Sequence, residues 1–114
     1  MTSGMRTVVY PVKDLARAKA LYGGLLGVAP YMDEPYYVGF RTDALEVGLD
    51  PRGHDQGMTA PVAYWNVDDI HAAVERLVAA GAEVEQPVRD VGRGTLIARL
   101  RDGDGNVTGL YQAP

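Results

Sequence analysis

The sequence predicts an α+β fold made of two tandem βαβββ modules that form a curved mixed sheet around a cleft. Three observations support this prediction. Residues 12–18 align with residues 67–73, so about half of the chain repeats. Each copy carries an apolar stripe with helical spacing after an aspartate. Each copy then continues with extended segments that short polar turns separate, which is typical of hairpins.

The first module begins with an expected strand at residues 7–10, and Asp14 then stands where a helix N-cap accepts free backbone N–H groups. Gly27 offers the stop for this helix. The apolar stripe of the helix consists of Leu15, Ala18, Leu21, Tyr22 and Leu25. The strands expected after it are a weak one at residues 29–32 and a hairpin of residues 36–41 and 44–49.

The second module repeats this order, with a strand at residues 62–66, a helix that begins after Asp69 and a stop at Gly81. The stripe of this helix consists of Ile70, Ala73, Val74 and Leu77. The strands expected after it are a weak one at residues 82–85 and a hairpin of residues 95–101 and 107–112. We therefore expect one domain over residues 1–114, with module one at about 5–50, a linker at 51–60 and module two at about 61–113.

Composition narrows the classes of function. The 114 residues contain no cysteine, which excludes disulfides, thiolate metal sites and cysteine nucleophiles. The single serine, Ser3, falls in what we expect to be a short frayed tail, so a serine hydrolase is also excluded. A chain this short builds one modest core, and we expect a homodimer interface to supplement it.

Charge and hydropathy favour a cytoplasmic protein. The net charge of −4 gives no general attraction to nucleic acid or to an anionic membrane, so neither is an expected partner. The longest uncharged run, residues 20–32, is too short to span a bilayer. The N-terminal residues lack the pattern of a secretion signal.

Several short strings look like functional motifs but have simpler explanations. Residues 102–106 resemble the start of a calcium loop, yet Val107 and Ala113 stand where such a loop needs glycine and glutamate, so we expect a hairpin turn. Residues 92–94 lack the other parts of a phosphate cradle and are expected to form a loop.

The two histidines do not have the spacing of a joint metal site. His54 falls in the linker, and His71 falls on a helix, four residues before Glu75, where an exposed pair is expected. The seven tyrosines and one tryptophan either pack within the sheet or line a ligand pocket, and the residues leave both options open.

Three strings together resemble the glyoxalase/bleomycin resistance/dioxygenase superfamily, also called the vicinal oxygen chelate fold. They are Val12-Lys13-Asp14-Leu15, Val67-Asp68-Asp69-Ile70 and Asp104-Gly105-Asn106-Val107, and the resemblance covers essentially the whole chain. It implies two modules that curl into a cleft. It also implies that metal enzymes of the family take ligands from the first and last strands of each module.

When the family's four metal-ligand positions are carried over to this chain, they fall on residues whose side chains have neither an imidazole nor a carboxylate to bind a metal. They are Thr7, Gly48, Val62 and Gly109. Because a divalent metal needs imidazole or carboxylate donors, we expect no metal and no other cofactor. The two glycines indicate either room for a ligand or a bend in the strand.

Strand alternation assigns further residues to the cleft face, because residues two apart in a strand share a side. With the four positions above, the expected ligand-binding residues are Val9, Glu46, Tyr64, Val107 and Tyr111. Trp65 is expected to point the other way, toward a helix.

Three functions remain open at this point. The first is a metal-free binding protein that sequesters a small aromatic or cationic molecule, with Glu46 favouring a basic ligand. The second is a lyase, isomerase or dioxygenase with atypical active-site residues, in which Glu46 is the weak candidate for a general base. The third is a non-catalytic dimeric accessory module.

Overall fold

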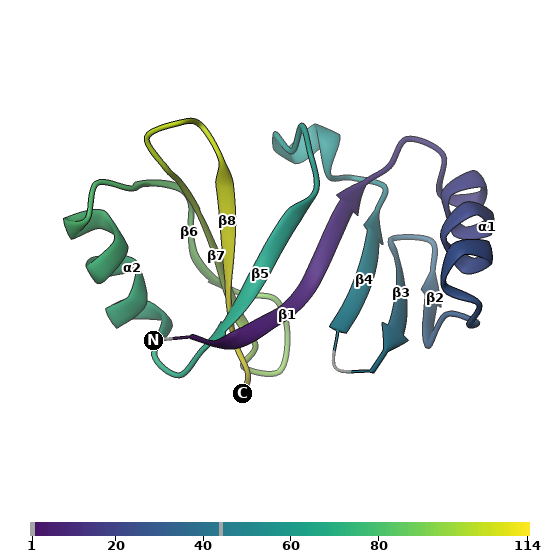
Figure 1. The fold of residues 1–114 in the computed structure, drawn as a ribbon, viewed down its shortest axis with the longest axis horizontal. Helices are drawn as coiled ribbons and strands as arrows, with labels where there is room; N and C mark the ends of the chain where they lie inside the picture. The colour runs from purple at the N-terminus through teal and green to yellow at the C-terminus, as the bar shows by residue number, and fades with distance from the viewer. Residues whose placement is uncertain (1, 44) are drawn as a thin grey trace. The chain divides into compact units, whose positions relative to one another are not determined.

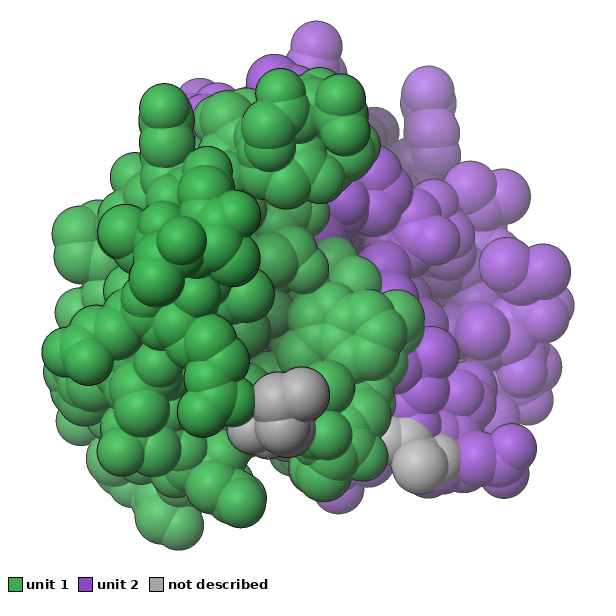
Figure 2. Space-filling model, turned by 60° about the vertical axis from the view of Figure 1, so that its left-hand side comes forward, with its two compact units in different colours: residues 1–6, 63–114 green, residues 7–62 purple. Residues whose placement is uncertain are grey.

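The computed structural model describes residues 2–43 and 45–114 of the chain (Figure 1). The described residues form two compact units, which are coloured separately in Figure 2. Unit 1 contains residues 2–6 and 63–114, and unit 2 contains the described residues from 7 to 62. Ala44, which we expected to begin a strand, lies outside the described residues.

Unit 2 is a sheet with the helix α1 (Leu15–Leu26) on one face. Its strands run in the order β2-β3-β4-β1, with β1 parallel to β4 and the other neighbours antiparallel. The strands are β1 (Thr2–Pro11), of which residues 7–11 belong to this unit, β2 (Met32–Glu34), β3 (Tyr37–Thr42) and β4 (Leu45–Asp50).

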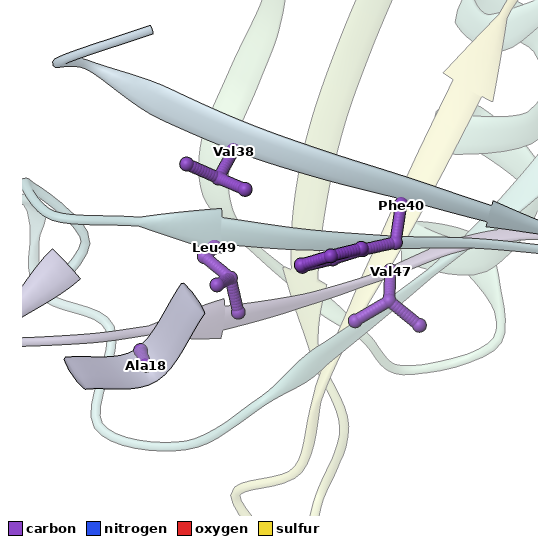
Figure 3. Packing of buried hydrophobic residues seen from close by; sticks show 5 residues of the cluster. All are labelled: Ala18, Val38, Phe40, Val47 and Leu49. Carbon is purple, nitrogen blue, oxygen red and sulfur yellow. The ribbon is translucent and has the colours of Figure 1, made fainter. Parts of the chain in front are cut away.

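The helix α1 has the ends that the sequence predicts, but its buried face differs, because Leu21 and Leu25 of the predicted stripe are exposed. Leu26, which was not part of that stripe, packs against the core instead. The Asp14 side chain accepts a hydrogen bond from the Arg17 N–H at 3.0 Å, and Gly27 ends the helix with φ 70°. Ala18 packs against four apolar residues of β3 and β4, and Phe40 is fully buried among them (Figure 3). Burial of a side chain of this size stabilises the fold by about 1.5–3 kcal/mol. The whole cluster is Ala18, Val38, Phe40, Val47 and Leu49.

Unit 1 repeats this arrangement with the helix α2 (Ile70–Ala79). The Asp69 side chain caps its start, and the Gln112 side chain accepts a hydrogen bond from the Ile70 N–H at 2.8 Å. Strand order is β5-β8-β7-β6, with β5 parallel to β8 and the other neighbours antiparallel. The strands are β5 (Val62–Val67), of which residues 63–67 belong to this unit, β6 (Glu83–Asp90), β7 (Leu96–Arg101) and β8 (Val107–Gln112).

The α+β class and the βαβββ order in each half of the chain are thus confirmed. The expected frayed tail is wrong, because β1 begins at Thr2. Main-chain pairing extends the strand over polar residues whose side chains give no apolar pattern. The strand expected at residues 29–32 lies at Met32–Glu34. Neither described helix is long and apolar enough to cross a membrane.

The segment 51–60, expected to be a linker, is part of unit 2. It contains the short 3-10 helix η1 (His54–Gln56), and the Met58 N–H donates to the Gly53 carbonyl at 2.9 Å. Met58 is buried, and Gly53 lies so close to Pro11 that a Cβ would sit 2.7 Å from the proline Cβ. This part of the chain therefore has a fixed path within its unit.

Candidate functional site

In unit 2 the sheet face opposite α1 gathers four of the predicted site residues. β1 and β4 run side by side in a register that pairs Thr7 with Glu46 and Val9 with Gly48. The intervening Val47 and Leu49 point to α1, so the alternation along β4 places Glu46 and Gly48 on the opposite face.

Glu46 is the polar centre of this face. Its Oε1 accepts hydrogen bonds from the hydroxyls of Thr7 at 3.3 Å and Tyr37 at 3.4 Å. Its Oε2 accepts one from the hydroxyl of Tyr31. Three hydroxyls from three segments of unit 2 therefore fix the position of one carboxylate.

Arg41 adds a cation to the same face. It is the direct cross-strand partner of Glu46 in the β3–β4 pair, and its guanidinium carbon lies 4.1 Å from the centroid of the Tyr31 ring. This distance is typical of a cation–π contact. The face already holds a planar cation against an aromatic ring whose hydroxyl contacts Glu46.

Tyrosine side chains pack directly over the glycines of this face. A Cβ at Gly48 would lie 2.6 Å from Cζ of Tyr37, and a Cβ at Gly39 would lie 2.8 Å from Cε1 of Tyr31. The sequence left two explanations for Gly48, a ligand that approaches the backbone or a strand bend. The structure shows a third, because a tyrosine of the same unit fills the space.

Unit 1 has the same feature at its last strand. Tyr64 is the register partner of Gly109 in the parallel β5–β8 pair, and its ring lies directly over the glycine. A Cβ at Gly109 would lie 2.6 Å from Cγ of Tyr64. Both family ligand positions that are glycine here are therefore covered by tyrosine.

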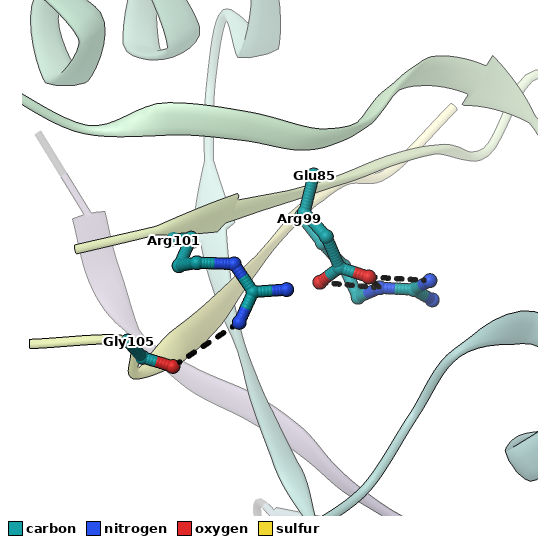
Figure 4. A network of polar contacts seen from close by, with 4 residues as sticks. All are labelled: Glu85, Arg99, Arg101 and Gly105. Carbon is teal, nitrogen blue, oxygen red and sulfur yellow. Dashed lines mark hydrogen bonds and ion pairs between the residues drawn. The ribbon is translucent and has the colours of Figure 1, made fainter.

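A buried ion pair lies on the same face of unit 1. Arg99, the cross-strand partner of Gly109, makes an ion pair with Glu85 at 3.2 Å (Figure 4). Burial disfavours the charge of Arg99, but the hydrogen bonds with Tyr64 and Glu85 outweigh this effect and hold its pKa above the ordinary value. The guanidinium therefore stays charged and ties Tyr64 to β6.

The remaining predicted residues of unit 1 are placed by the β8 register. Val107 and Tyr111 are two residues on either side of Gly109 and share its face. Trp65 pairs with Leu110, which packs in the α2 core, so Trp65 lies on the helix side as expected. The guanidinium carbon of Arg6 lies 5.0 Å from the centroid of the Tyr111 ring.

Val62, the last predicted residue, is buried in unit 2. The structure thus brings Thr7, Val9, Glu46 and Gly48 together in unit 2, and Tyr64, Val107, Gly109 and Tyr111 together in unit 1. Their role in binding a ligand stays a prediction. Sequence reasoning missed Tyr31, Tyr37, Arg41, Glu85, Arg99 and Arg6.

The motif-like strings behave as loops and surface residues. Residues 102–106 form a turn in which the Asp102 carboxylate accepts from the N–H groups of Asp104 and Asn106. His54 and His71 are both exposed. A separate groove of about 420 Å³ in unit 2 lies between α1 and β2, where Lys19 pairs with Asp33.

A family model described as Glyoxalase/Bleomycin resistance protein/Dioxygenase superfamily matches residues 4–110. The chain belongs to this superfamily. The resemblance expected from the sequence is therefore confirmed. Among relatives of this superfamily member, the proteins named "Putative glyoxylase CFP32" from Mycobacterium bovis and Mycobacterium tuberculosis are 30% identical over 113 residues. The match covers 88% of this chain and 42% of each relative, so the chain spans less than half the length of these curated relatives.

Solved structures agree on the fold of this superfamily member. A glyoxalase/bleomycin resistance protein/dioxygenase superfamily member from Vibrio splendidus 12B01 has a TM-score of 0.73 at 16% identity and covers 95% of this chain and 97% of its own. Methylmalonyl-CoA epimerase from Mycobacterium tuberculosis has a TM-score of 0.70 at 20% identity and covers 99% of this chain and 90% of its own. At these identities the likeness concerns the fold.

The residues at the four family ligand positions of this chain do not fit the divalent metal that the metal enzymes of the superfamily bind. Thr7 donates its hydroxyl to Glu46, and the space above Gly48 and Gly109 is filled by Tyr37 and Tyr64. Within residues 2–43 and 45–114, no three His, Cys, Asp or Glu side chains gather in a way that could hold a metal.

Proposed function

We propose that this chain is a metal-free, sequestration-type binding protein that holds a small aromatic or cationic molecule against the Glu46 face of unit 2. The observation that supports the proposal is the carboxylate of Glu46, which three hydroxyls position beside two tyrosine rings. An ionised carboxylate attracts a cation, and aromatic rings add stacking and cation–π contacts.

The position of Arg41 supports a planar cation as the ligand. Its guanidinium stacks on Tyr31 while the Tyr31 hydroxyl contacts Glu46. An incoming aromatic amidinium has the same charge and flatness as this guanidinium, so it would replace Arg41 on the ring. Arg41 is exposed and free to swing into solvent when this happens.

Benzamidinium, neutral benzamide and anionic benzoate form a matched set of probes for this face, because they differ mainly in charge. In an NMR titration we expect benzamidinium to shift the backbone amides of Glu46 and Arg41 saturably, and benzamide to shift them less. Glu46→Gln should remove the preference for the cation while leaving the fold intact. An equal response of Glu46→Gln and the parent chain to benzamidinium would overturn the proposal.

The alternative is an isomerase that uses Glu46 as general base. The phenols of Tyr31 and Tyr37 on its two oxygens are the observation that favours it, because they can supply a proton beside the base. Incubation with methylmalonyl-CoA in deuterated water, prompted by the epimerase with the same fold, tests this reading. Deuterium incorporation that Glu46→Gln abolishes would support catalysis. No deuterium incorporation would reject an epimerase of this substrate, and no response to any probe would favour the accessory module.

We also propose that the chain forms a homodimer. The helix α1 exposes Leu21 and Leu25 by 64% and 74%, four residues apart on one face. A second copy of the same helix face is complementary to this stripe under twofold symmetry. The cytoplasmic location expected from the sequence stays a prediction.

A further inference from the structure

We propose that unit 1 carries an oxyanion site at Arg6, which takes the carboxylate group of a small molecule. The site uses residues of unit 1 alone. It would therefore stand even if the Glu46 face of unit 2 bound nothing.

Among the described residues, the guanidinium of Arg6 has no hydrogen-bond acceptor and no counter-charge. It makes no hydrogen bond and no ion pair with any residue in the described parts of the chain, and its Nε is buried from solvent. A partly buried guanidinium without an acceptor or counter-charge costs free energy, and an oxyanion that pairs with its terminal nitrogens offsets this cost by compensating the charge. An exposed arginine such as Arg93 is hydrated by solvent and does not carry this cost.

The Tyr111 ring holds the guanidinium in place. The guanidinium carbon is 5.0 Å from the ring centroid, within the range of a cation–π contact. With Nε turned inward, the two terminal nitrogens remain for a ligand. Their parallel N–H groups match the two oxygens of a carboxylate.

The charges around Tyr111 favour an anion. Arg99 and Arg101 alternate along β7 on the sheet face that includes Tyr111 (Figure 4). Strand β6 adds to this face the carboxylates of Glu85 and of Glu83, the register partner of Arg101, and the cation of Arg89, the partner of Ile97. Glu85 forms its ion pair with Arg99, and Arg101 donates a hydrogen bond to the Gly105 carbonyl at 3.3 Å. Neither Glu83 nor Glu85 is an ion-pair partner of Arg6, and cations outnumber carboxylates on this face, so the local potential attracts an anion and repels a cation.

The surroundings favour a carboxylate over a phosphate. Ile97 and Val107 on this face are half-buried and apolar. A singly charged carboxylate loses less hydration free energy beside such residues than a phosphate dianion does. An aromatic carboxylate would also gain contact with these apolar side chains.

The test is an NMR titration of the ¹⁵N-labelled chain with benzoate, acetate and inorganic phosphate, read on the Arg6 Nε–Hε signal in the parent chain and on the backbone amide of Tyr111 in the parent chain and every variant. We expect benzoate and acetate to shift the Arg6 signal saturably, phosphate to act more weakly, and added salt to weaken all three. Arg6→Met should abolish the response and Arg6→Lys should reduce it. Arg93→Gln, an exposed loop arginine of the same unit, is the control and should respond as the parent chain does.

Three results would overturn the proposal. They are no saturable shift at Arg6 in the parent chain, an undiminished benzoate response in Arg6→Lys, and an equally strong response in Arg6→Met. The first two need no variant that removes the charge, so the test holds even if Arg6→Met folds poorly. Glu46→Gln should leave benzoate binding unchanged and Arg6→Met should leave benzamidinium binding unchanged, which separates this proposal from the one for unit 2.

Discussion

Gly109 is the residue on which the packing of Tyr64 depends. The atoms nearest to a Cβ at this position are Cγ and Cδ2, which lie at the root of the Tyr64 ring and cannot move aside without moving the whole side chain. We expect Gly109→Ala to lower the free energy of unfolding by about 1–3 kcal/mol, as other overpacked cores do. Denaturant unfolding followed by Trp65 fluorescence measures this change.

Gly103→Ala is the matched control for Gly109→Ala. Gly103 lies in the exposed turn between β7 and β8, and a Cβ there would meet nothing within 4 Å. Its effect should be close to zero. Equal effects of the two variants would contradict the structural role assigned to Tyr64.

Glu85 and Arg99 form an ion pair whose side chains are only 15% and 6% exposed. Removal of one partner leaves the other charge buried without compensation, which typically costs about 3–5 kcal/mol. Glu85→Gln keeps the shape of the side chain and one hydrogen-bond acceptor. We therefore expect it to lower the free energy of unfolding by an amount at or below the lower end of this range. A chemical denaturation curve measures it, with the exposed Glu83→Gln of the same strand as control.

A double variant tests whether the loss comes from the pair itself. Replacing both Glu85 and Arg99 by methionine removes the two charges together, so it should cost less than the sum of the single replacements. Strict additivity would show that the pair contributes no coupling energy.

At the scale of elements, helices and hairpins were predictable because their signals are local. Asp14 and Gly27 bound α1 by their own chemistry, a capping carboxylate and a backbone with positive φ. The start of β1 at Thr2 was not predictable, because main-chain pairing with distant residues creates it. Strand β6 is also longer than expected, since it runs past Pro87 at the edge of the sheet, with register shifts nearby.

The site divides in the same way between local and distant signals. The hairpin predicted with residues 42–43 as its turn places Gly39 opposite Glu46, whereas the structure places Arg41 there. Alternation still predicts that Arg41 and Tyr37 share the face of Glu46, because each lies two residues from Gly39. Tyr31 falls in the weak strand predicted at residues 29–32, but no pairing partner was predicted for that strand, so the hydrogen bond from Tyr31 to Glu46 could not be expected. The tyrosines over Gly48 and Gly109 depend on side-chain rotamers, which strand periodicity does not specify.

The turn between β7 and β8 carries a pH-dependent interaction. The side chain of Asn106 donates to the Asp102 carboxylate at 3.0 Å, and backbone N–H groups of the turn donate to it as well. These hydrogen bonds hold the pKa of Asp102 below its ordinary value of 3.8. The stabilisation is therefore complete at neutral pH and is lost as the pH falls through the lowered pKa.

Removal of the strongest of these donors should raise the pKa of Asp102. We expect Asn106→Ala to shift it toward the ordinary value, read from the carboxyl carbon signal in an NMR titration. Gly103→Ala keeps all the donors and should leave the titration unchanged. An Asp102 titration identical in Asn106→Ala and the parent chain would show that the Asn106 side chain has no effect on the carboxylate.

At the scale of the whole molecule, each unit has its own helix and its own buried cluster. Unit 2 is centred on Phe40 and Leu49, and unit 1 is centred on Ile70 and Leu100. Each cluster is small because the chain has only 114 residues, and no disulfide supplements it. A chain of this kind gains stability from any partner that binds only the folded state.

The proposed homodimer makes the stability depend on concentration. Mass action favours the folded dimer at high protein concentration, so the Tm should rise as the concentration is raised. Leu25→Gln replaces the most exposed apolar side chain of the Leu21–Leu25 stripe and should remove most of this dependence without disturbing the core, since Leu25 is 74% exposed. Val91→Gln, at an exposed apolar residue of unit 1, is the control and should keep the dependence. Sedimentation at the same concentrations gives the oligomeric state directly. A Tm that stays constant together with a monomer mass at every concentration would reject the dimer.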